Sequence, residues 1–447
     1  MDLKNKRVVV LGMGRTGIAT AKFLGSKKAQ VVVTDEKSVN AWGEGFKSIA
    51  REKWLQVANY DAEILDGASM VVPSPGVPPH NALLIEAQKR NIQIVGEIEL
   101  AYSFLNAPLI AVTGTNGKTT TTTLVGQILK QANKKIFIGG NIGIPLIEYA
   151  QRLPQADFVV AEISSFQLQW VEKFHPFISV LLNMTNDHTD YHGSFAEYVR
   201  IKSKIFAEQT AKDITIINAD DPAQRELTEK IRSKVVAFSS KRELREGIFV
   251  KGDQIIFKMQ GFAEEMYPLK MIKLPGWHNV ENVMAAVVAA RFCDADRQSI
   301  ESCVSNFYGL SHRIEYVGEK NSIKFYDDSK GTNVGAVVRA LETFSQPVIL
   351  LLGGRDKDGD FETLKPMLSQ KAKKIILFGE ARERISSLIG KGVKKVIIPK
   401  MRDAIEVAYK KARPGDIVLL SPGCASFDEF RDYKERGEYF KRIVRSL

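Results

Sequence analysis

Residues 108–123 read Pro-Leu-Ile-Ala-Val-Thr-Gly-Thr-Asn-Gly-Lys-Thr-Thr-Thr-Thr-Thr, an apolar strand followed by a glycine loop, a lysine and a run of hydroxyl residues. A loop of this kind at a helix N-terminus points backbone N–H groups at phosphate oxygens, so the stretch predicts a nucleotide triphosphate site. Lys118 is placed to reach the β- and γ-phosphates, and Thr119 to ligate Mg²⁺. The usual pattern has a glycine five positions before Gly117, where this chain has Val112, so the loop is a variant. A strand–turn–helix corner that binds nothing is the alternative.

The composition is that of an ordinary globular protein. The chain has 447 residues, 44% of them hydrophobic and 26% charged, which predicts two to four domains. The sequence has no apolar run of about 18 residues and no signal peptide pattern, so we expect no membrane span. The three cysteines, Cys293, Cys303 and Cys424, have no CxxC spacing. We therefore expect a cytoplasmic protein with neither a disulfide framework nor a zinc site.

The net charge is +11 and the isoelectric point is near 9.3. Nucleic-acid binding is one interpretation of such a charge. The basic residues are spread along the chain without a tight block of five or more, which favours a solvated basic surface. An anionic substrate such as a nucleotide would also benefit from this surface.

Strand and helix patterns alternate along most of the chain and predict an α/β protein with largely parallel sheets. We expect three domains in series: a Rossmann-like domain at 1–98, a central ATPase-like domain with a phosphate loop at 99–307, and a second Rossmann-like domain at 308–447. Residues 247–257 depart from this alternation and predict a β-hairpin with a Gly-Asp turn. The other expected strands are 7–12, 30–35, 69–73 and 92–95 in the first domain, 157–162, 178–183 and 214–218 in the second, and 347–352, 374–378 and 416–420 in the third.

The first domain carries a G-x-G-x-x-G fingerprint at 12–17, directly after a strand. Asp35 ends the next strand, where an acidic residue would bind a ribose hydroxyl. This pattern supports an NAD-dependent dehydrogenase. It equally supports a nucleotide-sugar site, because both ligands present a diphosphate to a helix N-terminus. Ser74-Pro75-Gly76 predicts a further rigid loop at the end of another strand, and a simple turn is the alternative.

Two segments of the central domain are candidates for metal binding. Glu162 ends an apolar strand beside the phosphate loop, as a metal ligand would. Asp187, His188, Asp190 and His192 lie together after the next strand, and Mg²⁺ prefers oxygen ligands but accepts an imidazole occasionally. Zinc fits less well because no cysteine accompanies these residues. The alternatives are an ordinary loop carboxylate and a polar loop.

The motifs together resemble the Mur ligases, the family that builds the peptidoglycan precursor. Residues 113–120 resemble the family's variant phosphate loop, and 183–188, 274–282 and 312–313 resemble motifs that the family shares with folylpolyglutamate synthases. Three narrower segments, 164–168, 328–333 and 421–428, resemble the member that adds D-glutamate. Relatives that add L-alanine or diaminopimelate have an Asp-Tyr-Ala-His type motif where this chain has Asp-Ser-Lys-Gly-Thr-Asn. The resemblance runs from about residue 7 to 440.

The resemblance implies an ATP-dependent ligase that joins D-glutamate to UDP-N-acetylmuramoyl-L-alanine in the cytoplasm, acting as a monomer without NAD, nucleic acid or a membrane span. The implied UDP-substrate residues are Gly14, Arg15, Thr16, Asp35, Glu36, Ser74, Pro75, Gly76 and Asn141. The implied ATP residues are Gly114, Thr115, Asn116, Gly117, Lys118, Thr119, Thr120, Asn279, Asn282, Arg313 and Asp328. The implied D-glutamate residues are Lys330, Thr332, Lys357, Ser426 and Tyr433, although the family often has Phe at the last position.

The same resemblance implies catalysis by Lys118, Glu162, His188 and Lys202. Two Mg²⁺ ions are expected, the first on Thr119 and Glu162 and the second on His188. Helical spacing from Phe195 places Lys202 beside Tyr198 but by itself gives the lysine no function. Lys202 aligns with a lysine that is carbamylated in this family, and a carbamate could approach a cation that an ammonium would repel.

Overall fold

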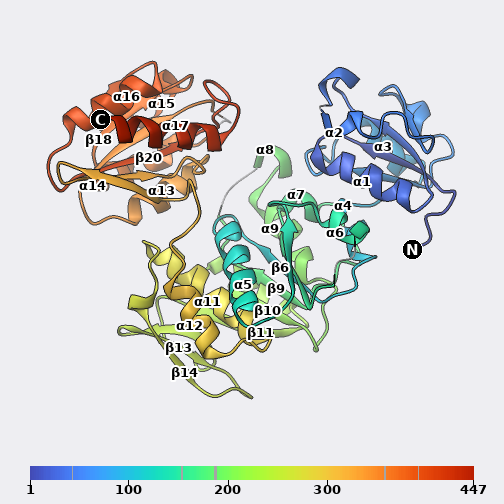
Figure 1. Cartoon of the computed structure of the whole chain (residues 1–447), viewed down its shortest axis with the longest axis horizontal. Coiled ribbons are helices and arrows are strands. Elements are labelled where there is room, and N and C mark those ends of the chain that lie inside the picture. The colour runs from blue at the N-terminus through green and yellow to red at the C-terminus, as the bar shows by residue number, and fades with distance from the viewer. Residues whose placement is uncertain (43, 153–154, 186–188, 357–358, 391) are drawn as a thin grey trace. The chain divides into compact units, whose positions relative to one another are not determined.

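The computed structural model describes all residues except 43, 153–154, 186–188, 357–358 and 391 (Figure 1). The chain forms two compact units, one made of Met1–Met271 and Glu281–Ser305, the other of Ile272–Val280 and Asn306–Leu447. The first unit holds two sheets and the second holds one. The predicted α/β class with mostly parallel sheets is confirmed. Among the described residues, no helix combines the length and the apolar character needed to cross a membrane.

The N-terminal sheet is fully parallel, in the order β3 (Leu55–Val57), β2 (Gln30–Thr34), β1 (Arg7–Leu11), β4 (Met70–Pro73) and β5 (Gln93–Ile94). Helices α1 (Arg15–Ser26) and α3 (Ala82–Lys89) join its strands. Val8, Val9 and Val10 of β1 have no exposed surface, as expected of a central parallel strand covered on both faces. The glycine loop follows β1 and leads directly into α1, so this loop lies at the carboxyl edge of the sheet.

In the described part of the chain, the central sheet has nine strands in the order β14-β13-β12-β11-β10-β9-β6-β8-β7. It is parallel from β7 (Ile136–Gly140) to β12 (Gly247–Lys251) and antiparallel beyond. The predicted hairpin is β12 with β13 (Gln254–Lys258), and it continues into β14 (Glu265–Pro268). The other strands are β6 (Leu109–Thr113), β8 (Phe158–Glu162), β9 (Ile178–Leu181), β10 (Ile214–Asn218) and β11 (Lys234–Ser239).

The N-terminal and central sheets share one hydrophobic core. Helix α4 (Glu97–Tyr102) packs on α6 (Leu146–Arg152), and α6 also packs on α1. Phe23, Tyr149 and Phe174 are buried in the same cluster of side chains. This shared core explains why residues on either side of the predicted boundary at 98 belong to one compact unit.

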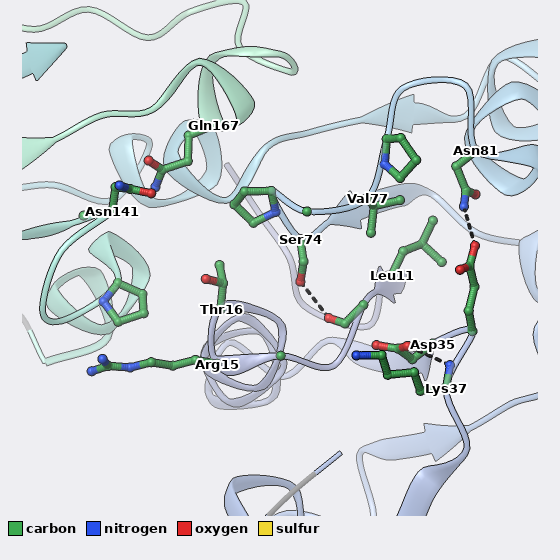
Figure 2. Close-up of a pocket in the computed structure, with 18 of the residues that line it drawn as sticks. Leu11, Arg15, Thr16, Asp35, Lys37, Ser74, Val77, Asn81, Asn141 and Gln167 are labelled. Carbon is green, nitrogen blue, oxygen red and sulfur yellow. Dashed lines mark hydrogen bonds between the residues drawn. The ribbon is translucent and has the colours of Figure 1, made fainter. Parts of the chain in front are cut away.

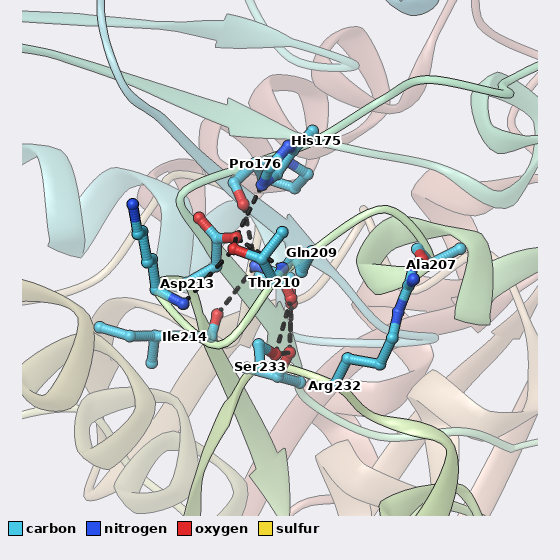
Figure 3. A network of polar contacts seen from close by, with 12 residues as sticks. His175, Pro176, Ala207, Gln209, Thr210, Asp213, Ile214, Arg232 and Ser233 are labelled. Atoms are coloured by element: carbon cyan, nitrogen blue, oxygen red, sulfur yellow. Dashed lines mark hydrogen bonds and ion pairs between the residues drawn. The ribbon is translucent and has the colours of Figure 1, made fainter.

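A buried network of hydrogen bonds lies at the end of the central sheet where β9 and β10 begin (Figure 3). Gln209 has no exposed surface; its Oε1 accepts hydrogen bonds from the hydroxyls of Ser179 and Thr215, and its Nε2 donates to Pro176 O and Ile214 O. Because both amide atoms of Gln209 have partners, burial leaves neither atom without a hydrogen bond. The network links the starts of β9 and β10.

The C-terminal sheet has the order β15 (Glu315–Lys320), β16 (Ile323–Asp327), β20 (Ile417–Gly423), β17 (Val348–Gly353), β18 (Ala372–Phe378) and β19 (Lys395–Ile397). Among the described strands of this sheet, only β15 and β16 pair antiparallel. Separate apolar clusters lie against its two faces, one including α13 (Val334–Glu342) and the other α16 (Met401–Lys411) and α17 (Tyr433–Ser446). The loops after β16 and β20 lie at adjacent positions on the carboxyl edge of this sheet.

Candidate active site

The phosphate loop joins β6 to α5 (Lys118–Gln131), as the sequence predicts. Gly114 and Gly117 have φ angles of +152° and +83°, so the loop needs glycine at both turns. A Cβ on Gly117 would lie 2.2 Å from Oδ1 of Asn282, which places Asn282 directly against the loop. The ammonium of Lys118 donates to the carbonyl oxygens of Gly114 and Thr115, both at 2.8 Å. The lysine therefore lies folded over the loop whose N–H groups would face phosphate.

Glu162, at the end of β8, lies beside the start of α5. Its Oε2 accepts a 2.6 Å hydrogen bond from the hydroxyl of Thr119, and its Oε1 accepts one of 2.6 Å from Nδ2 of Asn141. The Glu162 carboxylate is 2% exposed, and these two partners are neutral. A buried carboxylate next to a hydroxyl at a helix N-terminus is a donor set suited to Mg²⁺, so these residues fit the ion that the sequence predicts.

Lys202 lies on α9 (Phe195–Ser203) and is 1% exposed. Its Nζ donates to Oγ1 of Thr113 at 3.2 Å and to the carbonyl of Gly114 at 3.0 Å, and it lies 4.8 Å from the centre of the Tyr198 ring. The hydroxyl of Tyr198 is 2.9 Å from that of Thr115. Helix α9 thus contacts the phosphate loop through two side chains, which explains the predicted spacing of Tyr198 and Lys202.

The segment after β9 is held to the phosphate loop by Asn183. Its Oδ1 accepts from the backbone N–H of Asn116 at 2.8 Å, and its Nδ2 donates to Asn116 O. The predicted ligand His188 lies outside the described residues, so its role stays a prediction. His192, another member of the predicted polar loop, is buried; its Nε2 is 2.9 Å from the hydroxyl of Ser165, and its ring stacks on Phe166. His192 therefore lies against Ser165 and Phe166 of α7 (Ser165–Leu168).

A pocket of about 540 Å³ lies at the carboxyl edge of the N-terminal sheet (Figure 2). Ser74 supports it by donating a 2.6 Å hydrogen bond to Gly12 O. A Cβ on Gly17 would lie 1.9 Å from Gly12 O, so the fingerprint glycines are needed for close packing of helix against strand. All nine predicted UDP-substrate residues line the pocket: Gly14, Arg15, Thr16, Asp35, Glu36, Ser74, Pro75, Gly76 and Asn141. Asn141 therefore belongs both to this pocket and to the Glu162 cluster.

In the second unit, the predicted D-glutamate residues gather at the loops after β16 and β20. The ammonium of Lys330 lies 4.1 Å from the centre of the Tyr433 ring. Ser426 lies in the loop after β20 and is 2% exposed. Thr332 is half-buried in the turn that leads to α13. Lys357 lies outside the described residues, so its predicted contact with D-glutamate is not tested.

The predicted ATP residues of this unit have polar surroundings. Oδ2 of Asp328 accepts a 2.8 Å hydrogen bond from the hydroxyl of Ser421. Burial raises the pKa of Asp328 to about 7, against the opposing effects of Ser421 and of the positive charge of Arg313. Nδ2 of Asn279 donates to Pro275 O at 2.7 Å. The pKa of Asp328 therefore lies close to neutral pH, and perturbed pKa values of this kind cluster at functional sites.

A second cluster of potential metal ligands consists of His312, Glu315 and Asp327, whose ligand atoms all lie within 4.8 Å of one another. Nδ1 of His312 is 2.7 Å from Oδ2 of Asp327, and the ammonium of Lys441 is 2.6 Å from Oε2 of Glu315. Because Lys441 already brings a positive charge to the cluster, an ion-pair network accounts for these contacts.

Several residues around these sites could not be predicted from the sequence. Tyr60, Asn81 and Gln167 line the first pocket. The hydroxyl of Tyr191 donates to Val77 O at 3.0 Å and so connects the segment after β9 to the loop after β4. Arg436, which has no exposed surface, donates to backbone oxygens of the loops after β16 and β20. Gln167 lies in the segment 164–168 that resembles the family, although no role in the pocket followed from that segment. The other residues belong to no motif, and the sequence signal for Arg436 is an arginine amid the apolar positions of α17.

The fold and these sites define a nucleotide-binding protein of the phosphate-loop class. Three family models match the chain: the Mur ligase MurD-like N-terminal domain at residues 6–96, the Mur ligase middle domain at 112–290, and the Mur ligase glutamate ligase domain at 312–424. The chain belongs to the Mur ligase family.

The curated relatives are similar over their whole length. A UDP-N-acetylmuramoylalanine–D-glutamate ligase of Syntrophus aciditrophicus is 51% identical, with 100% of this chain and 99% of the relative aligned. A protein of the same name from Thermoanaerobacter pseudethanolicus is 40% identical over 100% of both chains.

Solved structures agree with the fold. A pseudomurein peptide ligase type C from Methanothermus fervidus superposes with a TM-score of 0.62 at 19% identity, covering 99% of this chain and 100% of that one. UDP-N-acetylmuramate-alanine ligase from Thermotoga maritima gives a TM-score of 0.60 at 18% identity, covering 99% of both chains.

Proposed function

We propose that this Mur ligase joins D-glutamate to UDP-N-acetylmuramoyl-L-alanine and converts ATP to ADP and phosphate, as a step of peptidoglycan precursor synthesis. The observation that carries the proposal is the position of Asn141, which lines the N-terminal pocket and also donates to Glu162 beside the phosphate loop. A nucleotide-linked substrate in the pocket would then have its far end near the γ-phosphate of ATP. The names of the curated relatives support this choice of substrate and amino acid.

The reaction needs an activated carboxylate, because a carboxylate is a poor electrophile toward an amine. Transfer of the γ-phosphoryl group to the substrate carboxylate gives an acyl phosphate. The amine of D-glutamate then attacks the acyl carbon, a tetrahedral intermediate forms, and phosphate leaves. The first step brings two anions together, so neutralisation of charge is the main task of the protein. Lys118 supplies one positive charge at the loop.

Thr119 and Glu162 would hold one Mg²⁺, and His188 the second. When bound, Mg²⁺ neutralises phosphate charge and orients the nucleotide. The arrangement of Glu162 supports this assignment, since its buried carboxylate contacts neutral donors on either side. Asn141 keeps the carboxylate in this orientation, so that its charge faces the start of α5.

We further propose that Lys202 is carbamylated in the active enzyme. The ammonium would lose one proton to give the neutral amine, and the amine would add to carbon dioxide and lose a second proton. The side chain would thereby change from a cation to an anionic carbamate. The burial of Lys202 beside Gly114 supports the proposal. At this place the charge of the side chain lies next to the phosphate loop, so a change from cation to anion would alter the electrostatic potential where phosphate and Mg²⁺ would bind. Lys202→Ala should lose most activity and recover part of it with short-chain carboxylic acids. Full activity of Lys202→Ala would contradict the proposal.

The C-terminal unit would bind D-glutamate through Lys330, Thr332, Lys357, Ser426 and Tyr433, since a dicarboxylate needs cationic and hydroxyl partners. Gly114 to Thr120, with Asn279, Asn282, Arg313 and Asp328, would bind ATP. The domain boundaries at 98/99 and 307/308, action as a monomer and a cytoplasmic location belong to the same proposal.

The test is phosphate release with ATP, Mg²⁺ and UDP-N-acetylmuramoyl-L-alanine, with D-glutamate, L-glutamate, L-alanine, L-lysine and diaminopimelate assayed in parallel. Turnover with D-glutamate alone is expected. Turnover with another amino acid would keep the ligase chemistry and overturn the D-glutamate assignments. No phosphate release together with tight NADH binding would instead favour the dehydrogenase that the fingerprint at 12–17 allows.

A further inference from the structure

Two acidic residues follow strand β2, and the structure gives them different roles. Oδ2 of Asp35 accepts the backbone N–H of Met13 at 2.6 Å, and Oδ1 accepts that of Lys37 at 2.9 Å. Both oxygens of Asp35 therefore hold the backbone of the glycine loop and of the turn after β2. The next residue, Glu36, lines the same pocket and is exposed.

The carboxylate of Glu36 is held by two residues from other parts of the N-terminal domain. The hydroxyl of Tyr60 lies 3.3 Å from its Oε1, and Nδ2 of Asn81 lies 3.4 Å from the same oxygen. Asn81 also donates to the hydroxyl of Tyr60. These three side chains form one connected wall of the pocket.

The direction of the hydrogen bonds in this wall is fixed. Asn81 is 7% exposed, and its Oδ1 accepts the backbone N–H of Leu83 at the start of α3. With the carbonyl used as a helix cap, the amide can only donate toward Tyr60. The phenol then donates to Glu36. Burial raises the pKa of Tyr60, and the charge of Glu36 raises it further, so the hydroxyl stays protonated at neutral pH.

The wall consequently presents an oriented carboxylate to the pocket. A carboxylate has about four acceptor positions, so two donors on one oxygen leave it able to accept from a ligand. A group that can only accept hydrogen bonds, such as a phosphate on the ribose, would be repelled at this place.

We propose that Tyr60 and Asn81 are positioning residues that hold Glu36 as the hydrogen-bond acceptor for a donor of the substrate's nucleoside, either a ribose hydroxyl or the imide N–H of a pyrimidine. This inference rests on the proposed function, which puts a UDP-linked substrate in the pocket.

The test is calorimetric titration of the full-length protein with UDP, 2′-deoxy-UDP, 3′-deoxy-UDP and 3-methyl-UDP. In the wild type, one analogue should bind about tenfold more weakly than UDP, the effect of losing one good hydrogen bond. The ratio of the Kd of this analogue to the Kd of UDP should fall close to one in Glu36→Ala. In Tyr60→Phe the same ratio should take a value between that of Glu36→Ala and that of the wild type. Tyr308→Phe, at an exposed tyrosine, is the matched control and should keep the wild-type ratio.

The ratio separates positioning from general damage, because a variant that folds poorly loses affinity for all four nucleotides alike. Equal ratios in the wild type and Glu36→Ala would overturn the inference. Turnover of UDP-N-acetylmuramoyl-L-alanine by the wild type distinguishes failure of the role proposed for Glu36 from failure of the proposed function. Turnover with unchanged ratios overturns only the role of Glu36, whereas absence of both turnover and UDP binding overturns the proposed function.

Discussion

The hydroxyl of Thr119 donates a 2.6 Å hydrogen bond to the carboxylate of Glu162, and this contact joins the start of α5 to the end of β8. Two strands that are neighbours in the sheet thus bring the start of α5 and a buried acid together. The sequence separation of these residues is 43, so the sheet order and not local structure creates the pair.

Glu162→Gln tests the contribution of the negative charge of Glu162, because the substitution keeps the size and shape of the side chain. The amide keeps the size of the side chain and can still accept from Thr119, but it carries no negative charge for Mg²⁺. We expect kcat to fall at least about hundredfold, as for removal of one electrostatic group from an active site. The Mg²⁺ concentration that gives half-maximal rate should rise as well.

The control is Glu172→Gln, at an exposed glutamate of the same unit. It should keep wild-type kinetics. Activity of Glu162→Gln within threefold of the wild type, with an unchanged Mg²⁺ dependence, would remove Glu162 from the metal site.

The stability of the first unit should depend on pH through Glu97. Burial raises the pKa of Glu97 from 4.5 to about 7, and the hydrogen bond that Oε1 accepts from the N–H of Ile147 opposes this shift. Because the folded state holds the proton more tightly than the unfolded state, stability should fall as the pH rises from about 4.5 to about 7. The loss should be about 3 kcal/mol, at 1.36 kcal/mol per pKa unit.

Glu97→Gln carries no titrating proton and should flatten this part of the profile. Denaturant unfolding at a series of pH values between 4.5 and 8 measures the effect, with Glu63→Gln at an exposed position as control. Parallel pH profiles for Glu97→Gln and the wild type would show that Glu97 does not titrate in this range.

Asp213 should have the opposite dependence. Burial alone would raise the pKa of Asp213, but hydrogen bonds from Thr210 and His175 lower it below its ordinary value. The ionised carboxylate therefore stabilises the fold above the ordinary pKa near 3.8, and this stabilisation is lost as the pH falls through the lower folded-state pKa.

Asp213→Asn should cost about 1–3 kcal/mol of unfolding free energy at pH 7, because it breaks charge-assisted hydrogen bonds at a buried site. The difference from the wild type should shrink toward pH 3. Asp253→Asn, in the turn between β12 and β13, is the matched control. A difference that does not change with pH would assign the cost to packing alone.

The local elements were predictable because they follow from periodicity and turn chemistry. The strand before the phosphate loop, the hairpin at 247–257 and the helix carrying Tyr198 and Lys202 are confirmed. The wall formed by Glu36, Tyr60 and Asn81 was not predictable, because its members are 24 and 45 residues apart and meet only when the strand order is known. Asp35 lies at the position that the fingerprint predicts, yet both its carboxylate oxygens accept hydrogen bonds from backbone N–H groups. Which partners such a carboxylate takes depends on the loop conformation, which the residue type does not determine.

Arg436 should control D-glutamate binding without touching the amino acid. The guanidinium donates to the hydroxyl and carbonyl of Ser329 at 2.9 and 2.8 Å, and to the carbonyls of Ala425 and Cys424 at 3.1 and 3.0 Å. Burial lowers its pKa to about 10, so the charge persists at neutral pH. It therefore fixes the loop of Lys330 to the loop of Ser426.

Arg436→Lys keeps the charge but loses the planar fork, so it cannot replace all four hydrogen bonds. The KM for D-glutamate should rise about tenfold through misplacement of the two loops, while the KM for the UDP substrate stays unchanged. Arg442→Lys, at an exposed position of the same helix, should leave both constants unchanged. If the two loops shift when Arg436 is replaced, the KM for D-glutamate must rise, because a small dicarboxylate binds only to groups held in place. A lower melting temperature with an unchanged KM for D-glutamate would therefore show that Arg436 stabilises the fold and does not position the site.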